Sequence, residues 1–179
     1  NGTQVDHSRL PGYETECLMD MALERISARK DSDRPFFMVI SVQPPHVPTL
    51  APAEHRRYQA QQLSLRPNVP RTHEEEARFQ LSGYYAQIDN IDSNLGRLMD
   101  RLNAEGMTEE THVMFFSDHG DQMGSQGRFG KCVPYEESAR VPFLIGGGQP
   151  MAYGNWSCGN KPCLINHVDI APTTLGLCG

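Results

Sequence analysis

Hydrophobic residues recur at a helical spacing in two stretches of the chain. Between residues 74 and 104 they follow one another at steps of four and three, as Tyr84, Ile88, Ile91, Leu95, Leu98 and Leu102. This spacing predicts one face of a long helix, which we expect to pack on a sheet. Residues 13–29 carry a shorter amphipathic pattern of the same kind, which predicts a second helix before the polar stretch at 30–34.

Short, uninterrupted apolar runs predict buried strands elsewhere. Phe36–Val42 follows a proline and is rich in strand-forming residues, and the later runs are His112–Phe116 and Val141–Ile145. Such runs are typical of strands buried on both faces, which belong to parallel sheets covered by helices. A last, short helix is expected over residues 168–177. This order of elements predicts an α/β fold, namely a three-layer α/β/α sandwich with a mainly parallel sheet and ligands at the carboxyl ends of its strands.

The connection over residues 43–72 differs in character from these elements. It holds six of the thirteen prolines and shows no sustained periodicity apart from a short helical stretch at 53–62. A connection of this length inside a domain is usually functional or a mobile lid. No linker or charge block divides the chain, so residues 1–179 are expected to form a single domain.

Composition and charge narrow the range of partners. Hydrophobic residues make up 38% of the chain and charged residues 21%, which is typical of a folded globular domain. The net charge of −6, with both signs interspersed, argues against a nucleic-acid partner. No apolar run approaches the roughly 18 residues of a membrane span. Five cysteines are too few for a disulfide scaffold, and Cys158 and Cys163 could pair locally or stay as free thiols.

The densest group of chemically active residues follows the second predicted strand. Asp118 and His119 stand together at its carboxyl end, where both side chains can reach one cation from a rigid support. Four glycines between residues 120 and 130 let the backbone curl around a ligand, and Lys131 returns a positive charge to the same loop. A cation and a lysine suit a site that binds a tetrahedral oxyanion and stabilises charge as its ester bond breaks. By spacing alone, Asp118 and His119 could equally cap or line a loop.

These residues lie within a longer ordered motif. The stretch from Ser117, read as Ser-Asp-His-Gly-Asp-x-x-Gly-x-x-Gly, is followed by Gly-Lys-x-x-x-Tyr-Glu-Glu-Ser-x-Arg-Val-Pro, which ends at Pro142. Together they resemble the second signature region of the sulfatases in the alkaline phosphatase superfamily. The segments Pro35-Phe-Phe, Pro44-Pro-His46 and Asn166-His-Val-Asp-Ile-Ala-Pro-Thr173 resemble the same family, so the likeness covers nearly the whole chain. It implies an alkaline-phosphatase-like sandwich.

The resemblance implies a role for four residues. Asp118 and His119 correspond to ligands of a divalent cation, usually Ca²⁺ in this family, although the imidazole leaves Mn²⁺ or Mg²⁺ open. Lys131 corresponds to a residue that binds the sulfate and neutralises the leaving oxygen. His46 corresponds to a histidine at the sulfate that hydrogen-bonds or protonates the leaving group. The alternative for His46 is a loop histidine held by local contacts.

Other polar residues are expected to have ordinary structural roles. His55, His73 and His112 are expected to be ordinary surface or strand residues, and the Arg56-Arg57 pair to be a solvated face rather than a contact for an anionic substrate. His167 and Asp169 are expected to form a network at a helix start, with Asp169 as a cap.

The nucleophile that the resemblance implies is missing. In the family it is a formylglycine made from a Cys/Ser-x-Pro/Ala-x-Arg motif, and none of the five cysteines fits that motif. No adjacent Asp-Asp pair completes the cation site. We therefore expect the chain to be a fragment, an incomplete sulfatase-type domain without its upstream nucleophile region and its carboxy-terminal subdomain. Alone it is expected to be inactive, and to associate with itself or with the missing amino-terminal half.

The resemblance predicts that the parent protein is a sulfuric ester hydrolase acting on a sulfated small molecule or glycan. A phosphonate or phosphate ester hydrolase of the same superfamily is one alternative, because a cation and a lysine do not distinguish sulfur from phosphorus. A non-catalytic binding module is another. The sequence itself does not settle the compartment, while the resemblance favours a secreted, periplasmic or lysosomal location.

Overall fold

The structure is a computed structural model, and it describes residues 10–29, 32, 34–148, 159 and 165–178. Two compact units make up the chain. The first runs up to residue 105 and includes 123–129, and the second comprises 106–122 and the chain from 130 onward. Cys158 and Cys163 lie outside the described residues.

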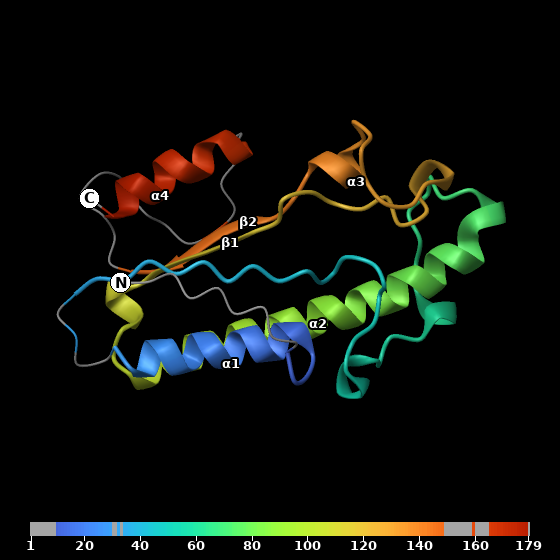
Figure 1. The fold of residues 1–179 in the computed structure, drawn as a ribbon. Helices are drawn as coiled ribbons and strands as arrows, with labels where there is room; N and C mark the ends of the chain where they lie inside the picture. The colour runs from blue at the N-terminus through green and yellow to red at the C-terminus, as the bar shows by residue number, and fades with distance from the viewer. Residues whose placement is uncertain (1–9, 30–31, 33, 149–158, 160–164, 179) are drawn as a thin grey trace. The chain divides into compact units, whose positions relative to one another are not determined.

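Two helices form the centre of the first unit. Helix α1 spans Glu14–Ser27 and lies beside α2, which spans Glu74–Ala104 (Figure 1). Three glutamates occupy the first turn of α2 and Arg101 its last, which complements the helix dipole at both ends. Met19, Leu23 and Ile26 of α1 are buried. Both predicted helices are confirmed, the longer one with its expected bounds.

The face that α2 buries is more polar than the sequence pattern predicts. Leu98 and Leu102 are buried as expected, but Ile88 is 41% exposed. Buried Asn90 and Asn94 accompany the two leucines, and the Asn94 side-chain amide donates to Asn90 Oδ1 at 3.3 Å. Hydrogen-bonded amides can be buried at little cost, and hydrophobic periodicity alone does not register them.

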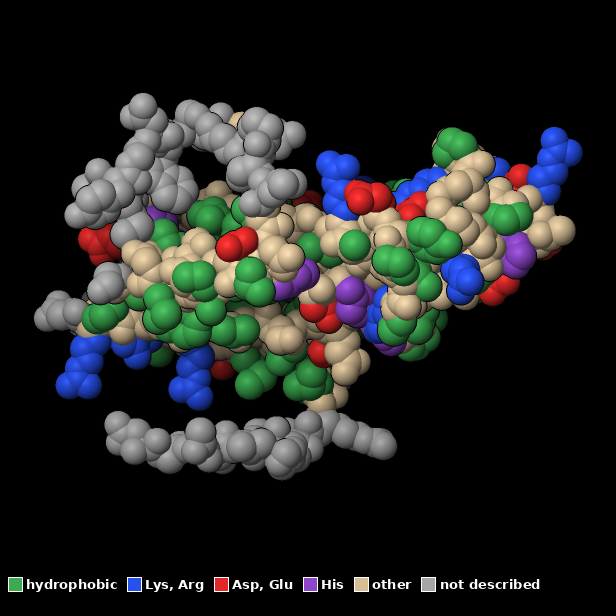
Figure 2. Space-filling view, turned by 90° about the horizontal axis from the view of Figure 1, so that it is seen from above, with side chains coloured by type: hydrophobic (Ala, Val, Ile, Leu, Met, Phe, Trp, Pro, Cys, Tyr) green, Lys and Arg blue, Asp and Glu red, His purple; other side chains and the backbone are tan. Residues whose placement is uncertain are grey.

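The expected strand at Phe36–Val42 is not a strand in this structure. The segment is irregular, and Phe37 and Val39 are 69% and 73% exposed. The loop after it contains the short 3₁₀ turns η1 (Ala53–His55) and η2 (Ala60–Gln62) in place of one helix, and η3 (Arg71–His73) leads into α2. Figure 2 shows hydrophobic side chains spread over one face of the molecule among charged ones.

The second unit contains an antiparallel strand pair. Strand β1 (His112–Phe116) pairs with β2 (Phe143–Gly147) in a register that sets His112 opposite Gly147 and Phe116 opposite Phe143. Gly147 has φ +68°, and a Cβ there would overlap the carbonyl oxygen of Thr111, so the strand end requires glycine. The remaining elements are η4 (Thr108–Glu110), α3 (Glu136–Ala139), η6 (His167–Asp169) and α4 (Ile170–Cys178).

The observed sheet differs from the expected mainly parallel sheet of a three-layer sandwich. Among the described residues it consists of two antiparallel strands, and β2 begins two residues later than the apolar run at Val141–Ile145. An apolar run shows that a segment can be buried, but a strand also needs a neighbour for its backbone groups. Phe36–Val42 has no such neighbour in the described residues. None of the described helices is long and apolar enough to cross a membrane.

Candidate active site

Asp118 and His119 occupy a turn directly after β1. The Ser117 hydroxyl donates to the His119 carbonyl at 2.8 Å, and the His119 amide donates to Asp118 Oδ1 at 3.0 Å. These two bonds fix the turn at the end of the strand. The Asp118 side chain is 84% exposed and that of His119 is 35% exposed, so both remain accessible from solution.

The two side chains present a carboxylate oxygen and a ring nitrogen side by side. His119 Nδ1 lies 2.9 Å from the Gly120 carbonyl oxygen, which can only accept, so Nδ1 carries the proton of the neutral ring. The other nitrogen, Nε2, then holds a lone pair 3.5 Å from Asp118 Oδ2. A divalent cation bound about 2.0–2.5 Å from each atom fits between them. The donor pair therefore fits a cation, and the cation-ligand role of Asp118 and His119 stays a prediction.

Backbone hydrogen bonds hold the loop that follows. The Gly120 amide donates to the Ser138 carbonyl at 2.8 Å, and the Gln122 amide donates to the Gly130 carbonyl at 2.9 Å. Gly130 in turn donates its amide to Asp121 Oδ1 at 3.1 Å. The chain therefore returns at Gly130 to the segment it left after His119.

Lys131 belongs to this returning segment. It lies between Gly130 and Cys132, which both have positive φ, +78° and +72°. Its side chain is half-buried, and in the described part of the chain its ammonium group makes no hydrogen bond or ion pair. The second unit thus brings Asp118, His119 and Lys131 into one hydrogen-bonded loop system, with an ammonium group that is free to bind an anion.

His46 belongs to the first unit, where it is exposed between two cis peptide bonds, Pro44-Pro45 and Val47-Pro48. The buried Gln87 amide of α2 donates to the carbonyls of His46 at 3.4 Å and Pro48 at 3.2 Å. His46 Nδ1 donates to the Val47 carbonyl at 2.7 Å, which leaves Nε2 as the acceptor of the neutral ring. Local contacts thus hold this histidine and leave one nitrogen for another group.

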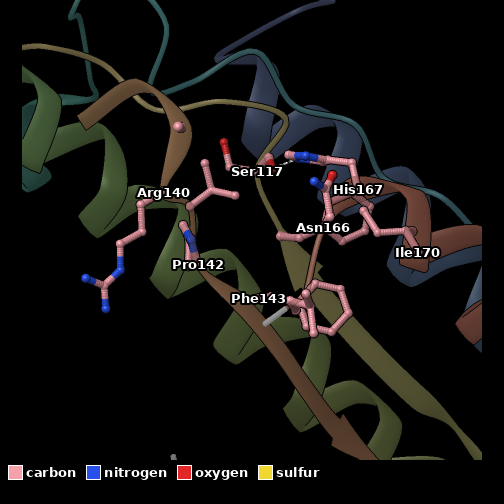
Figure 3. Close-up of a pocket in the computed structure, with 11 residues that line it drawn as sticks. Ser117, Arg140, Pro142, Phe143, Asn166, His167 and Ile170 are labelled. Atoms are coloured by element: carbon pink, nitrogen blue, oxygen red, sulfur yellow. Dashed lines mark hydrogen bonds between the residues drawn. The ribbon is translucent and has the colours of Figure 1, made fainter. Parts of the chain in front are cut away.

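A hollow of about 200 Å³ lies beside the turn that carries Asp118. Figure 3 shows the His167 ring directed toward the backbone of Ser117, with Asn166 beside it, whereas the Arg140 side chain extends away from them. His167 Nε2 donates to the Ser117 carbonyl at 2.9 Å. Asn166 and Asp169 form a capping box, so Asp169 does support the helix start, with Asn166 as its N-cap. The helix-start network thereby also supports the residue before Asp118.

Sequence reasoning did not identify Gln122 and Ser138 as supports of the site. Both are buried, and the Gln122 side-chain amide donates to Ser138 Oγ at 3.1 Å. The bond joins the loop of Asp118 to α3. Both residues lie within the signature motif, but nothing in its spacing indicates that their side chains meet.

Comparison with known proteins places this site in a family. A family model described as Sulfatase matches residues 2–179. The chain is 34% identical over 190 residues to the ulvan-active sulfatase of Formosa agariphila, covering 96% of this chain and 36% of that protein. The YidJ protein of Bacteroides fragilis, whose solved structure is described as that of a putative sulfatase, has a TM-score of 0.69 at 32% identity, covering 75% of this chain and 31% of that one.

A phosphonate monoester hydrolase from Agrobacterium radiobacter has a similar fold, with a TM-score of 0.64 at 23% identity, covering 75% of this chain and 34% of that one. The chain spans about a third of the length of these relatives. Because the family match extends over nearly all its residues, the chain belongs to the sulfatase family of the alkaline phosphatase superfamily.

Proposed function

We propose that this chain is part of an enzyme that hydrolyses sulfate esters, with Asp118 and His119 as cation ligands. The observation that carries the proposal is the 3.5 Å separation of Asp118 Oδ2 and His119 Nε2, in a loop that also holds Lys131. Membership of the sulfatase family supports it. Other ligands and the nucleophile, a formylglycine by resemblance, would come from outside this chain, so the chain alone is expected to show no turnover.

Ca²⁺ is the expected cation, because carboxylate oxygens are the ligands it prefers. The imidazole of His119 also suits Mn²⁺, and Mg²⁺ remains an alternative. When bound, the cation would supply positive charge that polarises the ester and stabilises negative charge in the transition state. The role of Asp118 is to hold that charge from a strand end, and the bond from His119 Nδ1 to Gly120 keeps the other ring nitrogen directed for coordination.

Lys131 and His46 would act on the sulfate group and the leaving oxygen. The Lys131 ammonium group, which has no hydrogen-bond or ion-pair partner among the described residues, can bind a sulfate oxygen and offset charge as the sulfur–oxygen ester bond breaks. His46 Nε2, when protonated, can donate that proton to the departing alcohol, while the bond from Nδ1 to Val47 keeps the ring in place. A sulfated glycan is the favoured substrate class, because the relative from Formosa agariphila is named for activity on ulvan.

We also propose that Phe36–Val42 joins a larger, mainly parallel sheet in the whole protein, as in a three-layer sandwich. The exposure of Phe37 and Val39 supports this proposal, because apolar side chains of this size are usually covered in a complete domain. The missing amino-terminal half is the expected partner. The family also favours a secreted, periplasmic or lysosomal location for the whole protein, and we include this location in the proposal.

Hydrolysis of phosphonate esters is the second candidate function. The similarity in fold between this chain and the Agrobacterium radiobacter enzyme favours it. The test is hydrolysis of p-nitrophenyl sulfate and p-nitrophenyl phenylphosphonate by the full-length protein, its Lys131→Ala variant and its Arg128→Ala variant. Arg128 is an exposed cation three residues away and serves as the matched control.

Sulfate hydrolysis that Lys131→Ala reduces by about 10²-fold or more, with Arg128→Ala close to wild type, would support the proposal. Faster turnover of the phosphonate would favour the second candidate. Cation binding without turnover of either ester would favour a non-catalytic binding module.

A further inference from the structure

A second cluster of metal-ligating side chains lies in the first unit and shares no residue with the proposed active site. Glu16 of α1 and Glu54 and His55 of η1 each offer one ligand atom, and these atoms all lie within 4.8 Å of one another. The residues come from segments nearly forty positions apart, so folding alone brings them together.

His55 is oriented by a carboxylate behind it. Its Nδ1 donates to Asp89 Oδ2 of α2 at 2.8 Å, and the His55 side chain is only 13% exposed, which corrects the expectation of a plain surface residue. Asp89 also accepts from Tyr58 at 3.3 Å and forms an ion pair with Arg57. Because the carboxylate oxygen of Asp89 accepts the bond from His55, the proton of the neutral His55 ring lies on Nδ1 and the lone pair on Nε2.

Glu16 is oriented by Asn90, which directly follows Asp89 on α2. The side-chain amide of Asn90 donates to Glu16 Oε1 at 3.1 Å, and Asn90 is completely buried. One carboxylate oxygen is therefore held from behind, and the other remains available. Asp89 and Asn90 are successive residues of α2, so one rigid helix orients both His55 and Glu16. Support of this kind is what metal-bound histidines and carboxylates usually have.

The spacing of the cluster suits an ion better than a direct ion pair. Among the described residues, His55 forms its ion pair with Asp89, and none within 4.0 Å joins it to Glu16 or Glu54. Two carboxylates and an imidazole thus lie close together without a direct ion pair among them, and the two carboxylates repel each other. A cation with bonds of about 2.0–2.2 Å would bridge the gap after small side-chain movements.

We propose that Glu16, Glu54 and His55 bind a divalent transition metal of borderline softness, with Zn²⁺ as the expected ion. Two carboxylate oxygens and one imidazole nitrogen are donors that Zn²⁺ accepts, and solvent can complete its coordination at the exposed Glu54. The ion would tie the loop that carries His46 to α1. The proposed metal site shares no residue with the proposed active site. Its three residues belong to the first unit, as His46 does, whereas Asp118, His119 and Lys131 belong to the second.

The test uses the full-length protein with Asp118→Ala as background, so that the proposed active-site cation does not contribute. Co²⁺ is titrated as a probe with visible absorption, and Zn²⁺ is then added as a competitor. The variants are Glu54→Gln, His55→Gln and Asp89→Asn. Glu24→Gln, which removes an exposed carboxylate from the same helix as Glu16, is the matched control.

We expect one equivalent of Co²⁺ to bind with an absorption spectrum that Zn²⁺ abolishes. Glu54→Gln and His55→Gln should each weaken binding by at least about tenfold, and Asp89→Asn by about 10- to 100-fold, while Glu24→Gln leaves it unchanged. Circular dichroism establishes that each variant is folded, which is expected above all for Glu54, an exposed residue of a surface turn. Absence of stoichiometric binding, or equal affinity in Glu54→Gln, His55→Gln and the background protein, would overturn the proposal.

Discussion

Replacing Gly120 by alanine adds a single methyl group, but it should shift the turn of the candidate active site and lower the stability of the protein. A Cβ at this position would overlap the carbonyl oxygen of Glu137, which is backbone and cannot move aside as a flexible side chain could. The turn after His119 would have to shift, and the bond from the Gly120 amide to Ser138 would be stretched. Overpacking costs about 1–3 kcal/mol and loss of one hydrogen bond about 0.5–1.5 kcal/mol. We expect a loss of about 2–4 kcal/mol in the free energy of unfolding.

Chemical denaturation of the full-length protein measures this loss, and calorimetric titration of Ca²⁺ measures the accompanying loss of affinity. Gly96→Ala is the matched control, because Gly96 lies inside α2 with nothing near its missing Cβ. Alanine there should stabilise the helix by about 0.5–1 kcal/mol. A Gly120→Ala protein with wild-type stability and wild-type Ca²⁺ affinity would refute the reasoning.

Three further results are expected. Asn166→Ala should destabilise the start of the last helix by about 0.5–2 kcal/mol, whereas Asn166→Asp should retain the cap; urea denaturation that finds both equal would contradict this role. Burial raises the pKa of Tyr13 above its ordinary value of 10.0, so its contribution to stability is present below pH 10 and declines at higher pH. Tyr13→Phe should abolish that decline in denaturation curves at pH 9–11, at a cost of about 0.5–1.5 kcal/mol for the bond to the Leu50 carbonyl. The isolated chain should form oligomers that Phe37→Ser with Val39→Ser reduces, and monomeric wild-type chain in sedimentation velocity would count against exposed apolar surface as the cause.

The two long helices could be predicted from sequence because their signals are local. The hydrophobic spacing and the glutamates of the first turn lie within α2, and Gly106 follows two residues after its end. The strand at Phe36–Val42 could not be judged in this way, because a strand depends on a partner elsewhere in the chain. The burial of Asn90 could not be predicted locally either, because its partner Glu16 lies on another helix.

The candidate site was predictable where its residues are neighbours in sequence. Asp118 and His119 are adjacent, and the glycines around them indicate a close turn. The supporting bond between Gln122 and Ser138 joins side chains sixteen residues apart, and spacing carries no information about it. The cluster at His55 depends on α1, η1 and α2 together, so sequence reasoning took that histidine for a surface residue.

The central claim is that Asp118 and His119 hold the cation of a sulfate ester hydrolase. Its most direct test is calorimetric titration of Ca²⁺ into the full-length protein and its Asp118→Ala variant, with hydrolysis of p-nitrophenyl sulfate followed on the same samples. We predict stoichiometric binding that Asp118→Ala abolishes, together with loss of hydrolysis. Unchanged Ca²⁺ affinity and unchanged hydrolysis in the variant would contradict the account.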